Sequence, residues 1–170
     1  TDDKLADVIP VKGNCHPDSV IGMIQGDKMF YLKVEDFPKY KRSSAGNRMI
    51  KNVKDLKLSH AIYFDATDNP DYMLIYAESG YMKILDTQFL SFSKRGNNTI
   101  SLQGKGIVGA TLIHGTEDDV DLYMGSLDNG KQKVRIQIAT GEEQKFKMST
   151  SIGTPVKVLR MKKNEWYAIT

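Results

Sequence analysis

The feature that most constrains this chain is an internal near-repeat with a period of about 50 residues. The run LKVEDFPKYKR at residues 32–42 corresponds to ILDTQFLSFSKR at residues 84–95, and the aligned Phe37 and Phe89 are 52 residues apart. A looser third copy aligns DNGKQKVRI at residues 128–136 with ESGYMKI at residues 78–84. Repeats this short need their neighbours to bury a core, which predicts a propeller or a stacked array.

Short β-branched and aromatic runs, bounded by turn residues, make up each repeat. No stretch of ten or more residues carries a 3.6-residue apolar stripe, so the chain is predicted to be all-β. KVRIQIA alternates strictly, and one face of that strand should carry Lys133, Arg135 and Gln137 into water. The clearest predicted strands are MFYLKV (29–34), HAIYF (60–64), YMLIYA (72–77), YMKIL (81–85), GIVGATLI (106–113), VDLYMG (120–125), KVRIQIA (133–139) and VKVLRM (156–161).

The predicted organisation is an N-terminal segment followed by one domain. Residues 1–18 contain LADVIPV, which is expected to pair with the last repeat or to cap the first. Residues 19–170 form the domain, with units at 19–71, 72–119 and 120–170. The single cysteine, Cys15, excludes an internal disulfide and suits a reducing compartment. No apolar run reaches about 18 residues, so we expect no membrane span. A cytoplasmic location is expected in keeping with the reducing compartment.

The sequence offers no credible active site. The histidines are scattered, and no phosphate-binding glycine loop or nucleophile elbow is present. Cys15 and His16 are neighbours without a second pair, which makes a poor metal site. We therefore expect no catalytic residue, metal or cofactor in this fragment.

The basic loops indicate a function more clearly than any candidate catalytic residue does. Five cations lie within thirteen residues at 39–51, and Lys94, Arg95 and Lys105 lie within 93–106. Cations that recur once per repeat would form a basic rim suited to phosphate. On charge alone a solvated, lysine-rich surface is favoured, because acids such as Glu35, Asp36 and Asp55 lie among the cations of the first unit, and both interpretations stay open.

The aromatic residues allow two interpretations as well. Phe37, Tyr40, Phe89 and Phe92 have the residue type that stacks on bases. Their repetition at matching positions favours packing in the core instead. Trp166 is expected to anchor the last strand.

The second unit resembles one blade of the C-terminal domain of type IIA topoisomerase A subunits, the gyrase A and topoisomerase IV ParC family. The resemblance covers about residues 19–170. The gyrase box QRRGGKG is absent, which favours a topoisomerase IV-like or divergent enzyme. The segments that carry it are YMLIYAESG, YMKI, QFLSF, SKRG, QGKGIVGA and TLI in the second unit, GDKMFYLKVEDFPKYKR and HAIYF in the first, and LYMGSLDNGKQKVRI and GTPVKVLRM in the third.

This resemblance implies a β-pinwheel, a propeller-like disc of about three four-stranded repeats whose blades exchange strands. It implies a non-catalytic domain that binds and bends duplex DNA through phosphates, with little sequence specificity, and guides a segment for strand passage. The implied partners are double-stranded DNA in the nucleoid, the rest of the A subunit, and the ATPase B subunit of an ATP-dependent topoisomerase. The implied DNA-binding residues are Lys33, Lys41, Arg42, Arg48, Lys83, Lys94, Arg95, Lys105, Lys133 and Arg135.

Two other functions remain open. A propeller-like protein–protein interaction module predicts a rim of mixed charge and an exposed apolar or aromatic patch. A small-molecule enzyme or binder requires a concave polar pocket formed by repeat-equivalent residues such as His60 and His114.

Overall fold

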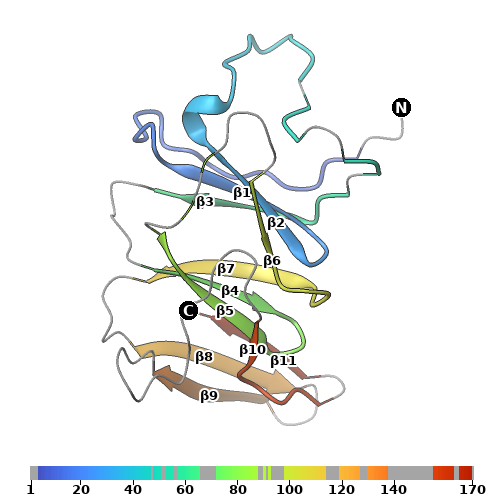
Figure 1. Ribbon diagram of the computed structural model, residues 1–170, viewed down its shortest axis with the longest axis vertical. Helices are drawn as coiled ribbons and strands as arrows, with labels where there is room; N and C mark the ends of the chain where they lie inside the picture. The colour runs from blue at the N-terminus through green and yellow to red at the C-terminus, as the bar shows by residue number, and fades with distance from the viewer. Residues whose placement is uncertain are drawn as a thin grey trace.

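The computed structural model describes eleven strands in three antiparallel sheets, and the predicted all-β class is confirmed (Figure 1). Within the described ranges, no helix has the length and apolar character needed to cross a bilayer. The described residues are 4–46, 48–50, 53–55, 57–65, 72–87, 90, 92, 98–113, 119–126, 130–137, 155–162 and 165–169.

The three sheets are stacked along the long axis of the molecule (Figure 1). The first has the order β3-β1-β2-β6, with strands His60–Phe64, Val20–Gln25, Lys28–Lys33 and Asn98–Ser101. A 3₁₀ turn, η1 (Val34–Asp36), follows β2. The second has the order β10-β5-β4-β7, with strands Val156–Lys157, Tyr81–Asp86, Tyr72–Ala77 and Ile107–Ile113. The third has the order β11-β8-β9, with strands Glu165–Ile169, Asp119–Ser126 and Gly130–Gln137.

Neighbouring repeats exchange strands. By sequence β6 belongs to the second repeat, yet it pairs with β2 of the first sheet. Likewise β10 belongs to the third repeat and pairs with β5 of the second sheet. Each sheet therefore contains strands from more than one sequence unit or lacks a strand of its own unit. The unit limit at 71/72 lies between β3 and β4, and the limit at 119/120 lies at the start of β8.

Backbone contacts at the hairpin turns hold the segments that follow the exchanged strands. The carbonyl oxygen of Gly26, in the β1–β2 turn, accepts the amide of Ile107 at 2.8 Å. The carbonyl oxygen of Gly80, in the β4–β5 turn, accepts the amides of Val158 and Leu159 at 3.0 and 3.2 Å. Gly80 has φ +83°, and a Cβ there would overlap the Leu159 carbonyl, so only glycine fits this junction without strain.

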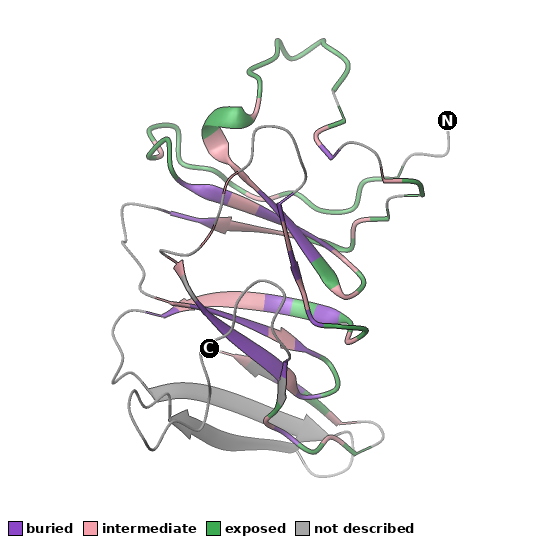
Figure 2. Ribbon diagram, viewed as in Figure 1, coloured by how far each residue is buried: buried purple, intermediate pink, exposed green. Residues whose placement is uncertain are grey.

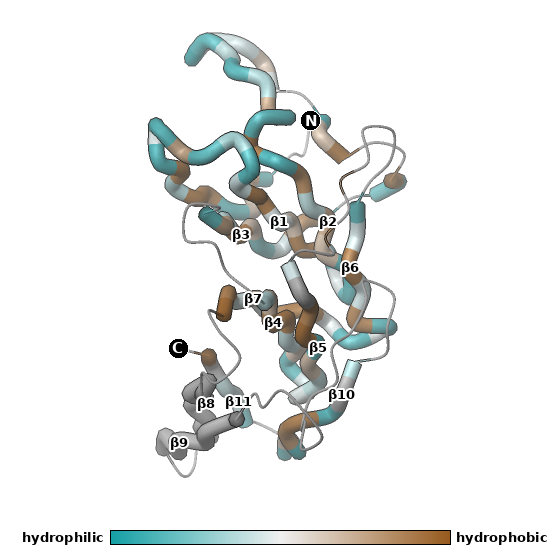
Figure 3. Tube along the Cα trace, turned by 60° about the vertical axis from the view of Figure 1, so that its left-hand side comes forward, coloured by the Kyte–Doolittle hydropathy of each residue, from teal (hydrophilic) through white to brown (hydrophobic). Residues whose placement is uncertain are grey.

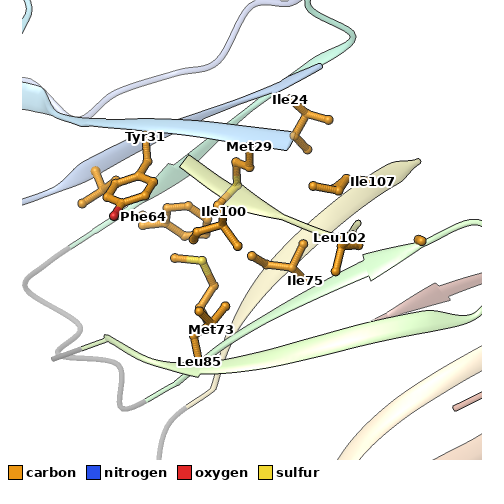
Figure 4. Packing of buried hydrophobic residues seen from close by; sticks show 12 residues of the cluster. Ile24, Met29, Tyr31, Phe64, Met73, Ile75, Leu85, Ile100, Leu102 and Ile107 are labelled. Atoms are coloured by element: carbon orange, nitrogen blue, oxygen red, sulfur yellow. The ribbon is translucent and has the colours of Figure 1, made fainter. Parts of the chain in front are cut away.

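Apolar side chains fill the spaces between the sheets. Met29 and Phe64 of the first sheet meet Met73 and Ile75 of the second in one buried cluster (Figure 4). The next residue along β4, Leu74, belongs to a second cluster on the opposite side. Successive strand residues point to opposite faces, and both faces of β4 are buried. The sequence of this strand is therefore a nearly continuous run of apolar residues.

The two ends of the stack are closed differently. On the outer face of the first sheet, Met23 and Phe30 pack against Ile50 from the segment between β2 and β3. At the other end, Tyr167 of β11 packs towards the second sheet and donates its hydroxyl hydrogen to the carbonyl oxygen of Ala77. Trp166 is 42 % exposed. The expectation that Trp166 anchors the last strand is therefore wrong, because the adjacent Tyr167 occupies the buried face.

The N-terminal segment lies beside the first sheet. Asp7 accepts the backbone amide of Ala61 at 2.8 Å, and Lys12 forms an ion pair with Asp65, also at 2.8 Å. Ala61 is in β3, and Asp65 directly follows that strand. Of the two positions considered for this segment, these contacts agree with a cap on the first repeat.

Candidate nucleic-acid interface

A cationic loop projects beyond the first sheet. It follows η1, and the amide of Ser44 donates to the carbonyl oxygen of Lys41 at 2.9 Å, which forms a turn. Residues 39–48 contain no acidic residue. Among the described side chains the four cations of this loop form no ion pair. Lys39, Lys41, Arg42 and Arg48 are all exposed (Figure 2), and the loops beyond the first sheet are mostly hydrophilic (Figure 3).

A second basic site is built around Tyr81. The ammonium of Lys105, from the turn between β6 and β7, lies 4.5 Å from the centre of the Tyr81 ring. Lys157 is directly opposite Tyr81 in the β10–β5 register, and its ammonium lies 5.5 Å from the same centre. An aromatic ring attracts cations at these distances without neutralising them as a carboxylate would. The ammonium groups of Lys105 and Lys157, which come from two different repeats, therefore lie beside the same ring.

Lys157 was not among the sequence candidates, although it is exposed. Its position depends on β10 crossing to the second sheet, and no feature of the sequence around residue 157 specifies that pairing. The expected strand at 156–161 contracts to two residues because the chain leaves the β5 edge to bind the Gly80 carbonyl. Lys105, in contrast, was expected at the interface and is half-buried beside Tyr81.

A groove of about 410 Å³ adjoins Lys105. Its charged residues are Lys105, Lys162, Glu78 and Glu165, so cations and carboxylates balance along it. The Glu165 carboxylate is also engaged, because it accepts the backbone amide of Lys162 at 2.6 Å. The groove by itself therefore has no strong preference for an anion.

Lys33 is largely neutralised by its neighbours. Its ammonium lies 2.6 Å from Asp18 and 3.7 Å from Glu35, and 5.3 Å from the centre of the Phe92 ring. The hydrogen bond that Lys33 donates to Asp18 is the main reason that the pKa of Lys33 is raised, and the same bond lowers the pKa of Asp18. A phosphate would have to compete with two carboxylates for this cation.

Lys83 lies in the interior rather than on the rim, and its expected role in binding DNA needs correction. The residue is 2 % exposed, and its ammonium donates a hydrogen bond to the Ser101 carbonyl oxygen at 2.6 Å. Burial lowers the pKa of this lysine. On β5 it shares a face with Leu85, which packs between the first and second sheets, so the stacked first sheet covers the position.

The remaining predicted residues are placed only in part. Lys94 and Arg95 lie outside the described residues. Lys133 and Arg135 are on β9, opposite Tyr123 and Asp121 of β8, and the structure describes their backbone positions. The expected alternation of KVRIQIA within a strand is consistent with this register.

The aromatic residues of the repeat divide between core and surface. Phe92 contacts Tyr31 edge to face, with ring centres 5.4 Å apart, and Phe37 packs on the outer cluster of the first sheet. For these two residues the prediction of core packing is confirmed. For Tyr40 it is wrong, because this side chain is 48 % exposed within the cationic loop. Phe89 lies outside the described residues.

A pocket of about 250 Å³ opens between the first and second sheets. Its walls are mainly apolar, and its charged groups already pair, Lys33 with Asp18 and Asp65 with Lys12. His60, which the small-molecule alternative places in a polar pocket, is exposed and does not line this pocket, while His114 lies outside the described residues. The pocket thus differs from the site that the small-molecule alternative requires.

Neither known protein families nor curated protein sequences give a match to this chain.

Proposed function

We propose that this chain is a non-catalytic domain that binds duplex DNA through its phosphates, built as a β-pinwheel of the type IIA topoisomerase A kind. The carrying observation is the loop at residues 39–48, in which four exposed cations occur without an acidic residue. Such a loop attracts a polyanion, and its release of counterions makes binding sensitive to salt.

Strand exchange supports the pinwheel part of the proposal. Two strands, β6 and β10, each complete the sheet of the preceding repeat. An exchange that recurs with the sequence period agrees with a propeller-like array in which adjacent blades share strands. In the full subunit such a domain would guide a DNA segment for strand passage beside the ATP-dependent enzyme.

The structure changes the set of residues proposed to bind DNA. Lys83 is removed because it is buried, and Lys33 contributes little because Asp18 pairs with it. Lys157 is added beside Lys105. The proposed DNA-binding residues of the loop and of the Tyr81 site are Lys41, Arg42, Arg48, Lys105 and Lys157.

The proposal is tested by fluorescence anisotropy with a labelled duplex of about 40 base pairs at low salt. Replacing Lys41, Arg42 and Arg48 together by glutamine should weaken binding by about tenfold or more, because three phosphate contacts are lost. The matched single variants are Lys41→Gln, which should weaken binding, and Lys33→Gln, which should leave it nearly unchanged. Equal effects of these two single variants would show that only total charge matters and would contradict the assigned site.

One observation favours a second candidate, the protein–protein interaction module. The N-terminal segment exposes Leu5 at 83 %, Val8 at 73 % and Val11 at 38 %. Apolar side chains clustered on one exposed segment are typical of a docking element. Absence of duplex binding at low salt would leave this candidate as the better explanation.

A further inference from the structure

The pocket between the first and second sheets has walls that belong to the core rather than to the surface. Phe64 of the first sheet and Met73 of the second are buried, lie between the two sheets and line the pocket (Figure 4). Val20 is buried in the same cluster, and Leu112 of β7 packs against it; both also line the pocket. Side chains beside a hollow lack packing partners on that side. An apolar group that enters therefore gains contacts and leaves water.

The volume of the pocket, about 250 Å³, sets the size of the ligand. A dry apolar cavity of about 150 Å³ binds benzene. Pockets for drug-sized molecules are larger, roughly 300–1,000 Å³. The pocket therefore fits one aromatic ring that carries a short side chain. Phe64 and Phe92 are in its lining, and aromatic rings make favourable edge-to-face or offset contacts with a further ring.

The charged groups of the pocket favour a cation over an anion. Among the described lining residues, Asp18 and Asp65 are carboxylates and Lys33 is an ammonium, so two negative charges face one positive charge. The ammonium of Lys33 is already engaged, at 2.6 Å from Asp18 and 3.7 Å from Glu35. An anionic ligand would therefore approach two carboxylates and would have to compete for the lysine.

Asp65 is the carboxylate best placed to hold a ligand cation. Its side chain is only 7 % exposed, and its attraction for a positive charge is strong because little water screens it. The side chain of its partner Lys12 is 65 % exposed and does not line the pocket, so it reaches Asp65 from the solvent side. A carboxylate offers about four lone-pair sites on its two oxygens. An ammonium inside the pocket can therefore share Asp65 with Lys12 or replace it.

We propose that this pocket binds a small arylalkyl amine, with the aromatic ring among Phe64, Met73 and Leu112 and the ammonium at Asp65. A cation is compatible with the aromatic wall, since the ammonium of Lys33 lies 5.3 Å from the centre of the Phe92 ring. The site is separate from the 39–48 loop and from the Tyr81 lysines, and it does not rest on duplex binding. It also differs from a polar pocket formed by repeat-equivalent histidines.

Three ligands of similar size test the assignment with the full chain. The probe is phenethylamine, which is protonated at neutral pH. The comparison compounds are phenethyl alcohol, which is neutral, and phenylpropionate, which is an anion. Isothermal titration should show saturable binding of the amine, about tenfold weaker binding of the alcohol, and the weakest binding for the anion. Equal affinities of amine and alcohol, stronger binding of the anion, or no binding of the amine would overturn the proposal.

Methionine methyl signals in an NMR titration locate the bound amine. Met73 lines the pocket, so its methyl signal should shift in a saturable manner. Met23 packs on the outer face of the first sheet and is the matched control, whose signal should stay in place. The variants Met73→Leu and Met23→Leu assign the two signals. Shifts at Met23 as large as those at Met73 would overturn the pocket as the site.

Two single variants at the ion pair test the role of Asp65. Asp65→Asn should weaken amine binding by about tenfold and leave alcohol binding nearly unchanged, because the charge-assisted hydrogen bond is lost. Lys12→Gln removes the competing ammonium and should strengthen amine binding by about twofold to fivefold. Lys28→Gln changes an exposed lysine of β2 that does not line the pocket, and it should leave both affinities unchanged.

The two variants test Asp65 independently of each other. If thermal melting shows that Asp65→Asn does not fold, Lys12→Gln still tests the ion pair, because the Lys12 side chain is mostly exposed. An affinity for the amine that does not rise in Lys12→Gln, or that does not fall in a folded Asp65→Asn, would overturn Asp65 as the group that holds the ammonium.

Discussion

The ammonium of Lys83, on the second sheet, lies 2.6 Å from the carbonyl oxygen of Ser101, on the strand that completes the first sheet. One hydrogen bond thus joins two sheets through a strand that the second repeat donates to the first. The lysine is 2 % exposed, so its charge is almost completely removed from bulk water. This position explains why a residue expected to contact DNA serves instead at the junction between repeats.

Burial of Lys83 makes stability depend on pH in a defined direction. Its folded-state pKa is lowered, so with rising pH the folded chain loses this proton before the unfolded chain does. The unfolded state then binds more protons, and the free energy of unfolding contributed by this group increases with pH. As the pH rises towards the ordinary pKa of lysine, about 10.4, wild type should gain stability relative to Lys83→Met.

The comparison with Lys83→Met isolates this group, since other titrating residues are the same in both proteins. Urea denaturation at several pH values measures the difference in the free energy of unfolding. If the difference in the free energy of unfolding stays constant as pH rises, or changes in favour of Lys83→Met, the burial of a charged Lys83 is contradicted.

Gly80→Ala should strongly destabilise the fold. The residue has φ +83°, and a new Cβ would overlap the Leu159 carbonyl oxygen of the exchanged third repeat. Backbone strain of about 1–3 kcal/mol would add to the displacement of that segment. Gly104→Ala is the matched control, because φ is +81° there and no atom lies within 4 Å of the Cβ position. Equal losses in the free energy of unfolding for both variants would argue against a close junction at Gly80.

Tyr167→Phe should lower the free energy of unfolding by about 1–2 kcal/mol, because it removes the hydrogen bond to the Ala77 carbonyl oxygen and leaves that acceptor without this donor. Trp166→Phe, one residue earlier and on the exposed face, should change stability little. Chemical denaturation of both variants checks the assignment. The reverse order of effects would restore Trp166 as the anchor of β11.

The Tyr81 site should contribute to DNA binding independently of the 39–48 loop. Replacing both Lys105 and Lys157 by glutamine should weaken duplex binding. The slope of log K against log salt should become less steep by the amount expected for about two lost phosphate contacts. Lys28→Gln, a change of an exposed lysine on the first sheet, provides a single-charge reference. An unchanged salt dependence in the double variant would remove these lysines from the interface.

Much of the fold follows from local pattern. YMLIYA predicts residues 72–77 as a strand, and β4 occupies those residues. The repeat is visible in backbone conformation too, since Asp55 and Gln103, 48 residues apart, have φ of 50° and 49° in turns before β3 and β7. Alternation and turn chemistry are local properties, which is why the sequence reveals them.

The site is less predictable because it depends on contacts between repeats. Nothing in YMKIL shows that the face of Lys83 would be covered by another sheet. The partner of Lys33 is Asp18, from outside the strand, and Lys157 reaches Tyr81 only through strand exchange. Whether a lysine is exposed, paired or buried is decided by such long-range neighbours, which periodicity alone does not specify.

The most direct test of duplex binding is the affinity for a duplex of about 40 base pairs measured across a series of salt concentrations. Each phosphate neutralised should contribute about 0.9 to the negative slope of log K against log salt. We expect tight binding at low salt, a steep linear decrease of log K with log salt, and similar affinities for duplexes of unrelated sequence. Absence of binding at low salt, or an affinity that salt does not change, would contradict the proposed duplex binding.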